Sequence, residues 1–329
     1  MRSFAFERAD DPAAALRAFR ANAHFLAGGT TLIDLMRLDV MRPEVVIDIN
    51  GMKERYAGVE SDERTVRLGA LTRMAEAAEH PILRRDFPVI AQSLALAASP
   101  QLRNMATLGG NVLQRTRCSY FRDPSWARCN KREPGSGCAA LDGVNRKHAV
   151  LGVSNACIAT YPGDFAAALI ALDATVELAG PEGARKISFE TLHREPGDRP
   201  DIETSLRPGE LITAFSVPRA DWTRRSAYLK IRDRQSYAFA LASAAIALDL
   251  RGDAIRAARI ALGGVATRPW RAREAEALLV GKPATAANFE AAAAAAFAGA
   301  RPRDGNRYKV ELGRRTLTRA LAEVAGMKV

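Results

Sequence analysis

The sequence has few cysteines and few aromatic residues, and it lacks the signatures of membrane and secreted proteins. Only four of its 329 residues are cysteine, and Phe, Trp and Tyr together make up 6%. No window approaches about eighteen uninterrupted apolar residues, so no membrane span is expected. The opening residues, MRSFAFERADDPAAALRAF, lack the apolar region and cleavage site of a secretory signal. We therefore expect no export signal of its own.

The net charge of +11 is compatible with nucleic-acid binding, but the motifs for it are missing. No RNP-like strand, zinc-finger helix or basic region with heptads is present. The basic residues are concentrated in 101–150, where nine Lys or Arg face three Asp or Glu. Such a segment suits compensation of a bound anion or docking of an acidic partner. No nucleic-acid partner is expected.

Hydrolytic chemistry is not indicated either, because no nucleophile–base pair stands out. The four histidines, His24, His80, His148 and His193, are isolated and are interpreted as structural. His148 lies between the third and fourth cysteines, so it alone is a candidate to support a metal ligand from outside.

The four cysteines, Cys118, Cys129, Cys138 and Cys157, fall within forty consecutive positions. Four thiolates can enclose one zinc ion or one iron–sulfur cluster. The intervals of ten, eight and eighteen residues contain no C-x-x-C knuckle of the kind that zinc sites use. This spacing favours a bulkier cluster. Two disulfides remain an alternative, although a chain without an export signal more often uses thiols for metal.

The pattern of apolar residues predicts an α+β protein with a second unit beginning near Asp221. Expected strands are 4–6, 24–27, 45–49, 65–68, 175–179, 227–231, 239–248 and 259–262. Expected helices are 12–19, 32–38, 73–79, 88–97, 162–172, 284–300 and 310–325. Asp10 or Asp11 before Pro12 is the expected N-cap of the first helix. The alanine-rich helix carries Phe289 and Phe297 at positions suited to burial.

Two glycine turns indicate a phosphate-binding backbone. Leu26, Ala27, Gly28, Gly29, Thr30, Thr31 and Leu32 lie between an expected strand and an expected helix. The second turn is Thr107-Leu108-Gly109-Gly110-Asn111. Glycine lets the backbone approach a ligand closely, and amide and hydroxyl groups bind anions. Neither turn is a Rossmann or P-loop motif. Each could be an ordinary turn, but the pair favours a dinucleotide.

Several segments together resemble the FAD-binding subunit of the xanthine oxidase/aldehyde oxidoreductase family. They are LAGGTTLIDLMR, ASPQLRNMATLGGN, GELITAFSVP, YLKIRDRQSYAFALAS and RIALGGVATRPWRA. The resemblance covers nearly the whole chain. The cysteine segment resembles the variant of bacterial periplasmic aldehyde oxidoreductases, whose medium subunit carries an extra 4Fe–4S cluster. Flavin subunits of ordinary xanthine dehydrogenases lack these cysteines.

The resemblance implies a vanillyl-alcohol-oxidase/PCMH-type FAD-binding domain of two α+β subdomains at 1–220. A cluster-binding loop is implied at about 115–160, and a smaller C-terminal domain of CO dehydrogenase flavoprotein type at 221–329. The first glycine turn would wrap the FAD pyrophosphate. The second would contact the ribityl and phosphate region through Thr107, Gly110 and Asn111, with Leu113 against the flavin.

Further residue roles also follow from the resemblance. Asp164 would bind the adenosine portion, although an Asp there could simply cap the next helix. Ile212 and Lys230 would lie near the isoalloxazine ring. An aromatic residue that covers the flavin in xanthine dehydrogenases falls near Ala97 here, and Tyr237 is the candidate replacement. The four cysteines match the ligands of the extra cluster.

The implied function is electron transfer within a molybdenum-dependent aldehyde oxidoreductase. A large subunit would hold the molybdenum cofactor, a small subunit the 2Fe–2S clusters, and FAD in this chain would pass electrons to an external acceptor. Flavin subunits of 4-hydroxybenzoyl-CoA reductase or xanthine dehydrogenase are alternatives within the family, and a zinc-stabilised scaffold is an alternative outside it. The expected location is the periplasm if a partner with a twin-arginine signal exports the complex, and otherwise the cytoplasm.

Overall fold

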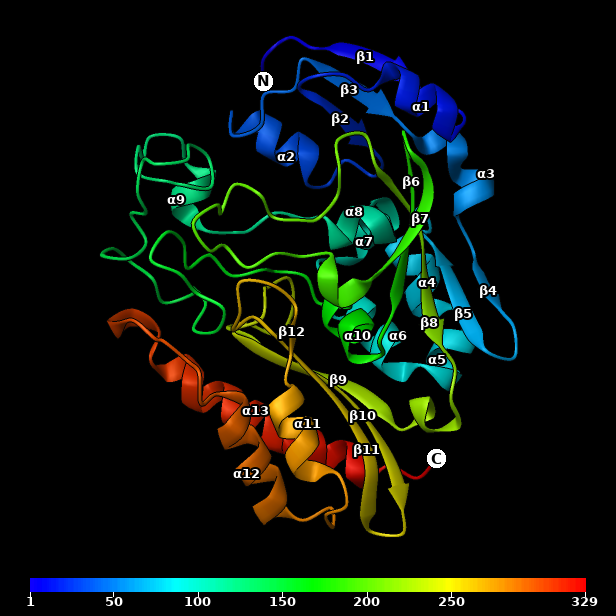
Figure 1. Cartoon of the computed structure of the whole chain (residues 1–329), viewed down its shortest axis with the longest axis vertical. Coiled ribbons are helices and arrows are strands. Elements are labelled where there is room, and N and C mark those ends of the chain that lie inside the picture. Colours follow the sequence, from blue (N-terminus) through cyan, green and yellow to red (C-terminus); the bar gives the residue numbers. More distant parts are fainter.

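A computed structural model describes all 329 residues, which form three sheets with helices packed around them (Figure 1). The N-terminal sheet has the strand order β1-β3-β2, with β1 at Ala5–Arg8, β2 at Ala23–Leu26 and β3 at Val45–Asp48. Both outer strands run parallel to β3, because helices α1 (Pro12–Ala18) and α2 (Leu32–Arg37) provide the crossovers. This is the first α+β subdomain.

The residues at the start of α1 determine where this helix begins. The Asp11 carboxylate accepts a hydrogen bond from the Ala14 amide at 2.7 Å, which satisfies one of the free N–H groups of the first turn. Pro12 follows at the first helical position. The expected N-cap is therefore confirmed at Asp11.

The second subdomain has a five-stranded antiparallel sheet of order β4-β5-β8-β6-β7. The strands are β4 Val59–Ser61, β5 Thr65–Gly69, β6 Thr175–Gly180, β7 Gly183–Ser188 and β8 Leu211–Pro218. The helices are α3 Lys53–Tyr56, α4 Met74–Glu79, α5 Pro81–Asp86, α6 Pro88–Ala95, α7 Pro100–Met105, α8 Leu108–Val112 and α10 Phe165–Ala171. Every residue of α10 is buried, so this helix is the centre of the core and not a surface helix.

The C-terminal domain is a four-stranded antiparallel sheet with its own helices on one face (Figure 1). Its strands are β9 Ser226–Ile231, β10 Ala242–Arg251, β11 Ala254–Gly263 and β12 Trp270–Arg271. Its helices are α11 Arg273–Leu279, α12 Ala286–Ala296 and α13 Tyr308–Ala325. The opposite face contacts α6 and α10 of the preceding domain.

Because both faces of this sheet are covered, β10 is apolar along most of its length, and its residues from Ala242 to Leu248 are all buried. Side chains of a strand alternate between the two faces. Accordingly, Ala244 and Ile246 belong to the core of the C-terminal domain, whereas Ala245 and Ala247 belong to the core of the preceding domain. The sheet therefore joins the two domains firmly.

The alanine-rich α12 is a packed helix, as expected. Phe289 and Phe297 are buried, and the Phe297 ring lies where a side chain on Gly313 of α13 would have to be, 2.2 Å from its would-be Cβ. The absence of a side chain at Gly313 thus allows α12 and α13 to approach each other closely.

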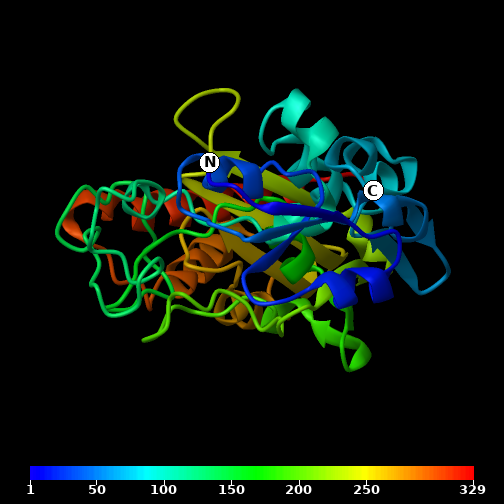
Figure 2. The ribbon, with the colours of Figure 1, turned by 90° about the horizontal axis from the view of Figure 1, so that it is seen from above.

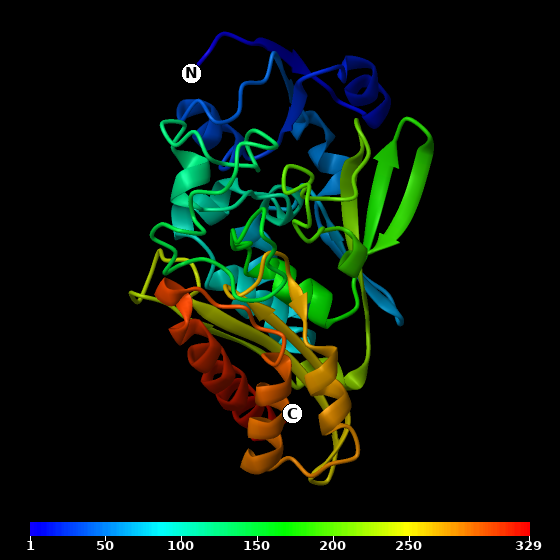
Figure 3. The same cartoon turned by 60° about the vertical axis from the view of Figure 1, so that its left-hand side comes forward.

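The segment from Leu113 to Asp164 contains a single short helix, α9 at Ser119–Arg122. In Figure 3 this teal and green segment lies between the blue N-terminal subdomain and the red α13. Side chains tie it to both, since Arg122 pairs with Asp34 of α2 and the Asn306 amide donates to the carbonyls of His148 and Ala149. It is an ordered loop, held by contacts with other parts of the chain.

No helix combines the length and apolar character required to cross a bilayer.

Candidate functional site

A cleft of about 990 Å³ lies where both subdomains, the cysteine-bearing segment and the β9–β10 connection meet. Volumes of this size are typical of sites for large ligands. Figure 2 shows the yellow β9–β10 connection projecting from the body of the molecule. This connection contributes Tyr237 and Phe239 to the cleft wall, and both side chains are strongly exposed.

The first glycine turn lies against Met105 and Ala106, which directly precede the second glycine turn, at one side of this cleft. A Cβ on Gly28 would stand 2.0 Å from the Met105 carbonyl oxygen and 3.0 Å from the Ala106 Cα. Gly29 has a φ of 71°, in the left-handed region that glycine adopts without strain. Only glycine at position 28 therefore lets the first turn reach the second.

Polar groups on these turns face the cleft. Thr30, Thr31 and Asn111 line it, and the Oδ1 of Asn111 is buried without a hydrogen-bond partner. A buried acceptor without a partner is costly unless a ligand satisfies it. Thr107 instead caps α8, accepting a hydrogen bond from the Gly110 amide at 3.2 Å. The turns thus fit a ligand with hydroxyl and phosphate groups.

The structure brings some expected site residues to the cleft and leaves others around it. Thr30, Thr31, Asn111 and Asp164 line the cleft. Outside its lining lie Leu26, Ala27, Gly28, Gly29, Leu32, Thr107, Gly110, Leu113, Ile212 and Lys230. Of these, Ile212 is in β8 among core residues, and Leu113 follows α8 with a partly exposed side chain. The individual FAD contacts of these residues remain predictions.

Asp164 is buried and forms an ion pair with Lys230 at 2.7 Å, and it accepts a hydrogen bond from the Tyr228 hydroxyl at 2.6 Å. It makes no side-chain capping bond to α10, so the helix-cap alternative is wrong. Burial raises the pKa of Asp164, while Lys230 and Tyr228 oppose that rise. The resemblance assigns Asp164 and Lys230 to different parts of FAD, whereas in the structure the two side chains form a single ion pair.

Cations dominate the wall formed by the cysteine-bearing segment. Arg117 and Arg122 both bind Asp34, at 3.0 and 2.9 Å, and all three line the cleft. Burial alone would raise the pKa of Asp34, but the hydrogen bonds and charges of the two arginines bring it below its usual value. Arg146 and Lys147 similarly pair with Asp233. The excess positive charge suits an anionic dinucleotide.

The sequence pointed to the basic segment 101–150 as compensation for an anion, but it did not identify the carboxylate partners Asp34 and Asp233. Asp34 is three residues after Thr31, a spacing typical of the first turn of a helix, and this was an available signal. The partners of Asp34 could not be inferred, because they come from a remote, irregular segment. Arg115 and Lys131 instead share the partly buried Glu203, with Arg115 at 2.6 Å and Lys131 at 3.5 Å.

Ala97 and Tyr237 both line the cleft. Ala97 is buried, whereas Tyr237 is 56% exposed and has a φ of 50°. A non-glycine residue in this region marks local strain, which clusters at ligand sites. Tyr237 thus lies on the same cleft as Ala97, and its packing on the flavin remains a prediction.

Lys309 of α13 is fully buried directly behind the cleft. Its ammonium group donates to the carbonyls of two cleft-lining residues, Gly264 at 2.6 Å and Lys147 at 3.1 Å. No carboxylate pairs with it; Asp233 acts only at a distance. Burial, with the charges of Arg146 and Lys147, lowers the pKa of Lys309 to about 7.

We expect the difference in unfolding free energy between wild type and Lys309→Met to depend on pH. The pKa of Lys309 is about 7 in the folded chain against 10.5 ordinarily, so between these values the unfolded chain binds the extra proton. Wild-type stability should therefore rise with pH in this window, by at most about 1.4 kcal/mol per pH unit relative to the variant. Urea unfolding at pH 7 and pH 9 measures this. The prediction is contradicted if the unfolding free energies of wild type and Lys309→Met change by the same amount between pH 7 and pH 9.

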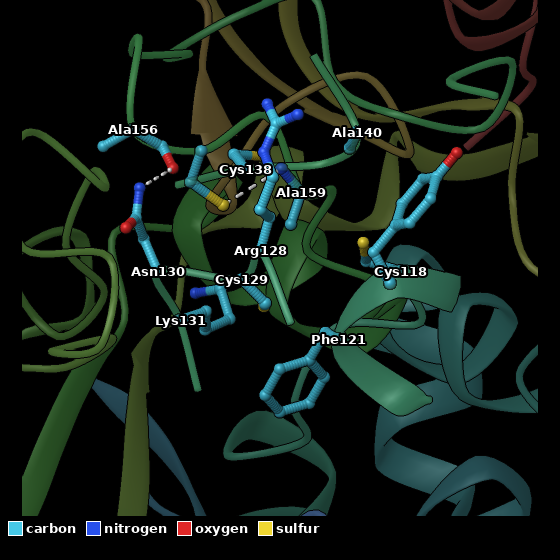
Figure 4. Close-up of a pocket in the computed structure, with 12 residues that line it drawn as sticks. Cys118, Phe121, Arg128, Cys129, Asn130, Lys131, Cys138, Ala140, Ala156 and Ala159 are labelled. Carbon is cyan, nitrogen blue, oxygen red and sulfur yellow. Dashed lines mark hydrogen bonds between the residues drawn. The ribbon is translucent and has the colours of Figure 1, made fainter. Parts of the chain in front are cut away.

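All four cysteines line a second, smaller pocket, shown in Figure 4. All are free thiols, so the structure contains neither of the two disulfides considered above. Cys129 and Cys138 face each other in an antiparallel bridge. The Asn130 side chain closes this loop, accepting from the Gly137 amide at 2.8 Å and donating to the Ala156 carbonyl at 3.0 Å. Residues distant along the chain are thus held around one pocket.

The thiol environment is apolar with two cations at its edge. Tyr120 and Phe121 line the pocket together with Arg128 and Lys131. Burial raises the pKa of Cys118 to about 12 and that of Cys157 to about 11, and neighbouring thiols add to both shifts. A metal would therefore have to displace protons as it binds. No three His, Cys, Asp or Glu side chains lie close enough together to hold a single metal ion.

His148 lies beside Cys118, with its Nε2 3.1 Å from the cysteine sulfur. Burial lowers the pKa of His148 to about 4, so the imidazole is neutral near pH 7. The other three histidines lie outside both pockets. Trp126 packs edge-on against Tyr120 and remains half-exposed.

Comparison with known proteins agrees with a two-domain flavin-binding class. The sequence model described as the FAD binding domain in molybdopterin dehydrogenase matches residues 2–220, and that of the CO dehydrogenase flavoprotein C-terminal domain matches residues 227–324. The chain is 47% identical over 326 residues to the aldehyde oxidoreductase FAD-binding subunit PaoB of Escherichia coli (strain K12), covering 98% of both chains. It is 28% identical to the glyceraldehyde dehydrogenase medium chain of Sulfolobus acidocaldarius, covering 85% of this chain and 82% of that one.

The fold comparison gives the same result. The reconstituted CO dehydrogenase from Oligotropha carboxidovorans superposes with a TM-score of 0.77 at 26% identity, covering 99% of each chain. The chain therefore belongs to the FAD-binding subunits of the xanthine oxidase family of molybdenum-containing oxidoreductases, which include aldehyde oxidoreductases. The expected α+β fold and family are confirmed.

Proposed function

We propose that this subunit transfers electrons in a molybdenum-dependent aldehyde oxidoreductase, with FAD in the cleft and a 4Fe–4S cluster in the four-cysteine pocket. Thr30, Thr31, Asn111 and the cation Arg117 would hold the dinucleotide, and Cys118, Cys129, Cys138 and Cys157 would hold the cluster. When bound, FAD supplies both one-electron and two-electron chemistry. The residues of this chain would bind and orient these groups, and the apolar lining of the thiol pocket would limit the access of water there.

The observation that carries the cluster proposal is the gathering of all four cysteines around one pocket. The wide spacing of the four cysteines, without the C-x-x-C knuckle that zinc sites use, supports a cluster over zinc. Arg128 and Lys131 line the same pocket and lower the cost of holding several thiolates there. The high pKa values of the free thiols do not oppose this, because metal binding stabilises the thiolate directly.

The partners follow from the similarity to PaoB, the FAD-binding subunit of an aldehyde oxidoreductase. We propose a heterotrimer in which a large subunit holds the molybdenum cofactor and oxidises the aldehyde, and a small subunit holds 2Fe–2S clusters. The electrons would leave this chain for an external acceptor. We propose a periplasmic location if a partner with a twin-arginine signal exports the complex, and a cytoplasmic one otherwise.

The test is anaerobic purification of this chain together with its co-expressed partners. We expect the complex to contain FAD, molybdenum and iron, and to reduce an artificial acceptor when an aldehyde is added. Colourless protein with one zinc per chain and no flavin would contradict the proposal and favour a scaffold. Oxidation of xanthine without oxidation of aldehydes would instead indicate a xanthine dehydrogenase-like enzyme.

A further inference from the structure

Cys118 belongs to both cavities, because its side chain lines the thiol pocket and also the large cleft. It is the one residue that the two linings share. The other three cysteines line the thiol pocket alone. The Cys118 side chain therefore separates the two cavities.

His148 lies beside Cys118 on the cleft side. It lines the cleft, is only 5% exposed, and places Nε2 3.1 Å from the Cys118 sulfur. An imidazole that carries its proton on Nε2 can donate it to the Cys118 sulfur, which is the hydrogen-bond partner of Nε2. Its Nδ1 is buried and makes no hydrogen bond. The Nε2–H tautomer is thus the one that satisfies the neighbouring sulfur.

The backbone around His148 is held rigidly. The His148 amide donates to the Asn145 carbonyl at 2.9 Å, and the His148 carbonyl accepts from the Asn306 amide at 3.3 Å. Asn306 itself is fully buried, in the short 3-10 turn Asp304–Asn306 that precedes α13. The C-terminal domain therefore sets the position of this imidazole, although the cysteines all belong to the preceding domain.

We propose that His148 is a positioning residue that donates a hydrogen bond to the Cys118 thiolate and makes this pair the link between the cluster pocket and the flavin cleft. The inference rests on the proposed function, since it requires a cluster on Cys118. A hydrogen bond to a ligand sulfur stabilises the more negative, reduced form of an iron–sulfur cluster and so raises its midpoint potential. Of the four cysteines, only Cys118 is also in contact with the cleft, so a ligand in the cleft would affect the cluster through Cys118 and His148.

The test compares redox titrations of the cluster signal in the purified complex. His148→Phe removes the donor and keeps the ring volume, and it is expected to shift the midpoint potential to a lower value. His148→Gln keeps an N–H group and is expected to remain closer to wild type. The matched control is His193→Phe, because His193 is similarly buried and its Nε2 binds the Val112 carbonyl at 3.1 Å, outside both cavities. That control should leave the potential unchanged.

A second readout tests the link itself. Removing FAD should shift the cluster signal of wild type and should shift that of His148→Phe less. Loss of iron from His148→Phe alone, with iron kept in His148→Gln and His193→Phe, would also support the positioning role. An unchanged midpoint potential in His148→Phe, or equal loss of iron in His148→Phe and His193→Phe, would overturn it. Wild-type complex without cluster iron in this chain would overturn the proposed function instead.

Discussion

Replacing Cys157 by serine is expected to remove the proposed iron–sulfur cluster while leaving FAD in the protein. Cys157 is buried in the pocket that all four cysteines line, and its sulfur accepts a hydrogen bond from the Ala159 amide at 3.4 Å. A hydroxyl is a much harder and weaker ligand for iron than a thiolate, and one missing ligand leaves the cluster open to oxidation and loss. The purified complex should lose about four iron atoms relative to wild type.

Glu133→Gln is the matched control for this experiment. Glu133 is exposed and lies between Cys129 and Cys138 in the same loop, but it does not line the pocket. Its variant should keep the iron content and visible absorbance of wild type. FAD and molybdenum are quantified in all three complexes, so loss of assembly is distinguished from loss of the cluster. Unchanged iron in Cys157→Ser would refute a four-thiolate cluster in this chain.

Gly28→Ala is expected to weaken FAD binding strongly. The added Cβ would lie 2.0 Å from the Met105 carbonyl oxygen and 2.8 Å from its carbon, both of which are backbone atoms. The first glycine turn must therefore move away from the second, which disturbs the cleft wall formed by Thr30 and Asn111. Overpacking of this kind costs about 1–3 kcal/mol, which corresponds to roughly a 5- to 150-fold loss of affinity.

Titrating FAD into deflavinated complex, followed by flavin fluorescence, measures this loss. The control is Gly299→Ala, because a Cβ at Gly299 meets no atom within 4 Å and its backbone is not in the left-handed region. Thermal melts of both variants reveal any general loss of stability. Wild-type affinity in Gly28→Ala would show that the contact between the two glycine turns does not shape the FAD site.

Regular elements with a strong local pattern were predictable. The expected helix 310–325 is α13 at Tyr308–Ala325, and the expected strand 45–49 is β3 at Val45–Asp48. Each element has an apolar pattern that can be read from its own residues. In α13 this pattern corresponds to the one buried face of the helix, and in β3 to burial of the central strand of its sheet. The short helices α7 and α8 were missed, although Ser99 before Pro100 is a start signal and accepts a hydrogen bond from the Leu102 amide.

Where tertiary contacts compete with local pattern, the prediction was less accurate. The expected strand 239–248 begins only at Ala242, since Phe239 lies in the exposed connection at the cleft, where the Arg117 guanidinium packs over its ring at 5.0 Å. The strand β7 was not predicted. Its side chains are mostly exposed, and β7 forms by pairing with β6 at the edge of the sheet.

The sequence by itself determined the family, the two glycine turns and the crowding of four cysteines, because these are properties of short segments. The tertiary structure alone decided which groups meet: Asp164 with Lys230, Asp34 with Arg117 and Arg122, and Cys118 with His148. Each of these contacts joins residues at least thirty positions apart, most of them through irregular backbone. No local periodicity encodes such contacts. They depend on how the domains and the cysteine-bearing loop pack, and that packing places the thiol pocket against the large cleft.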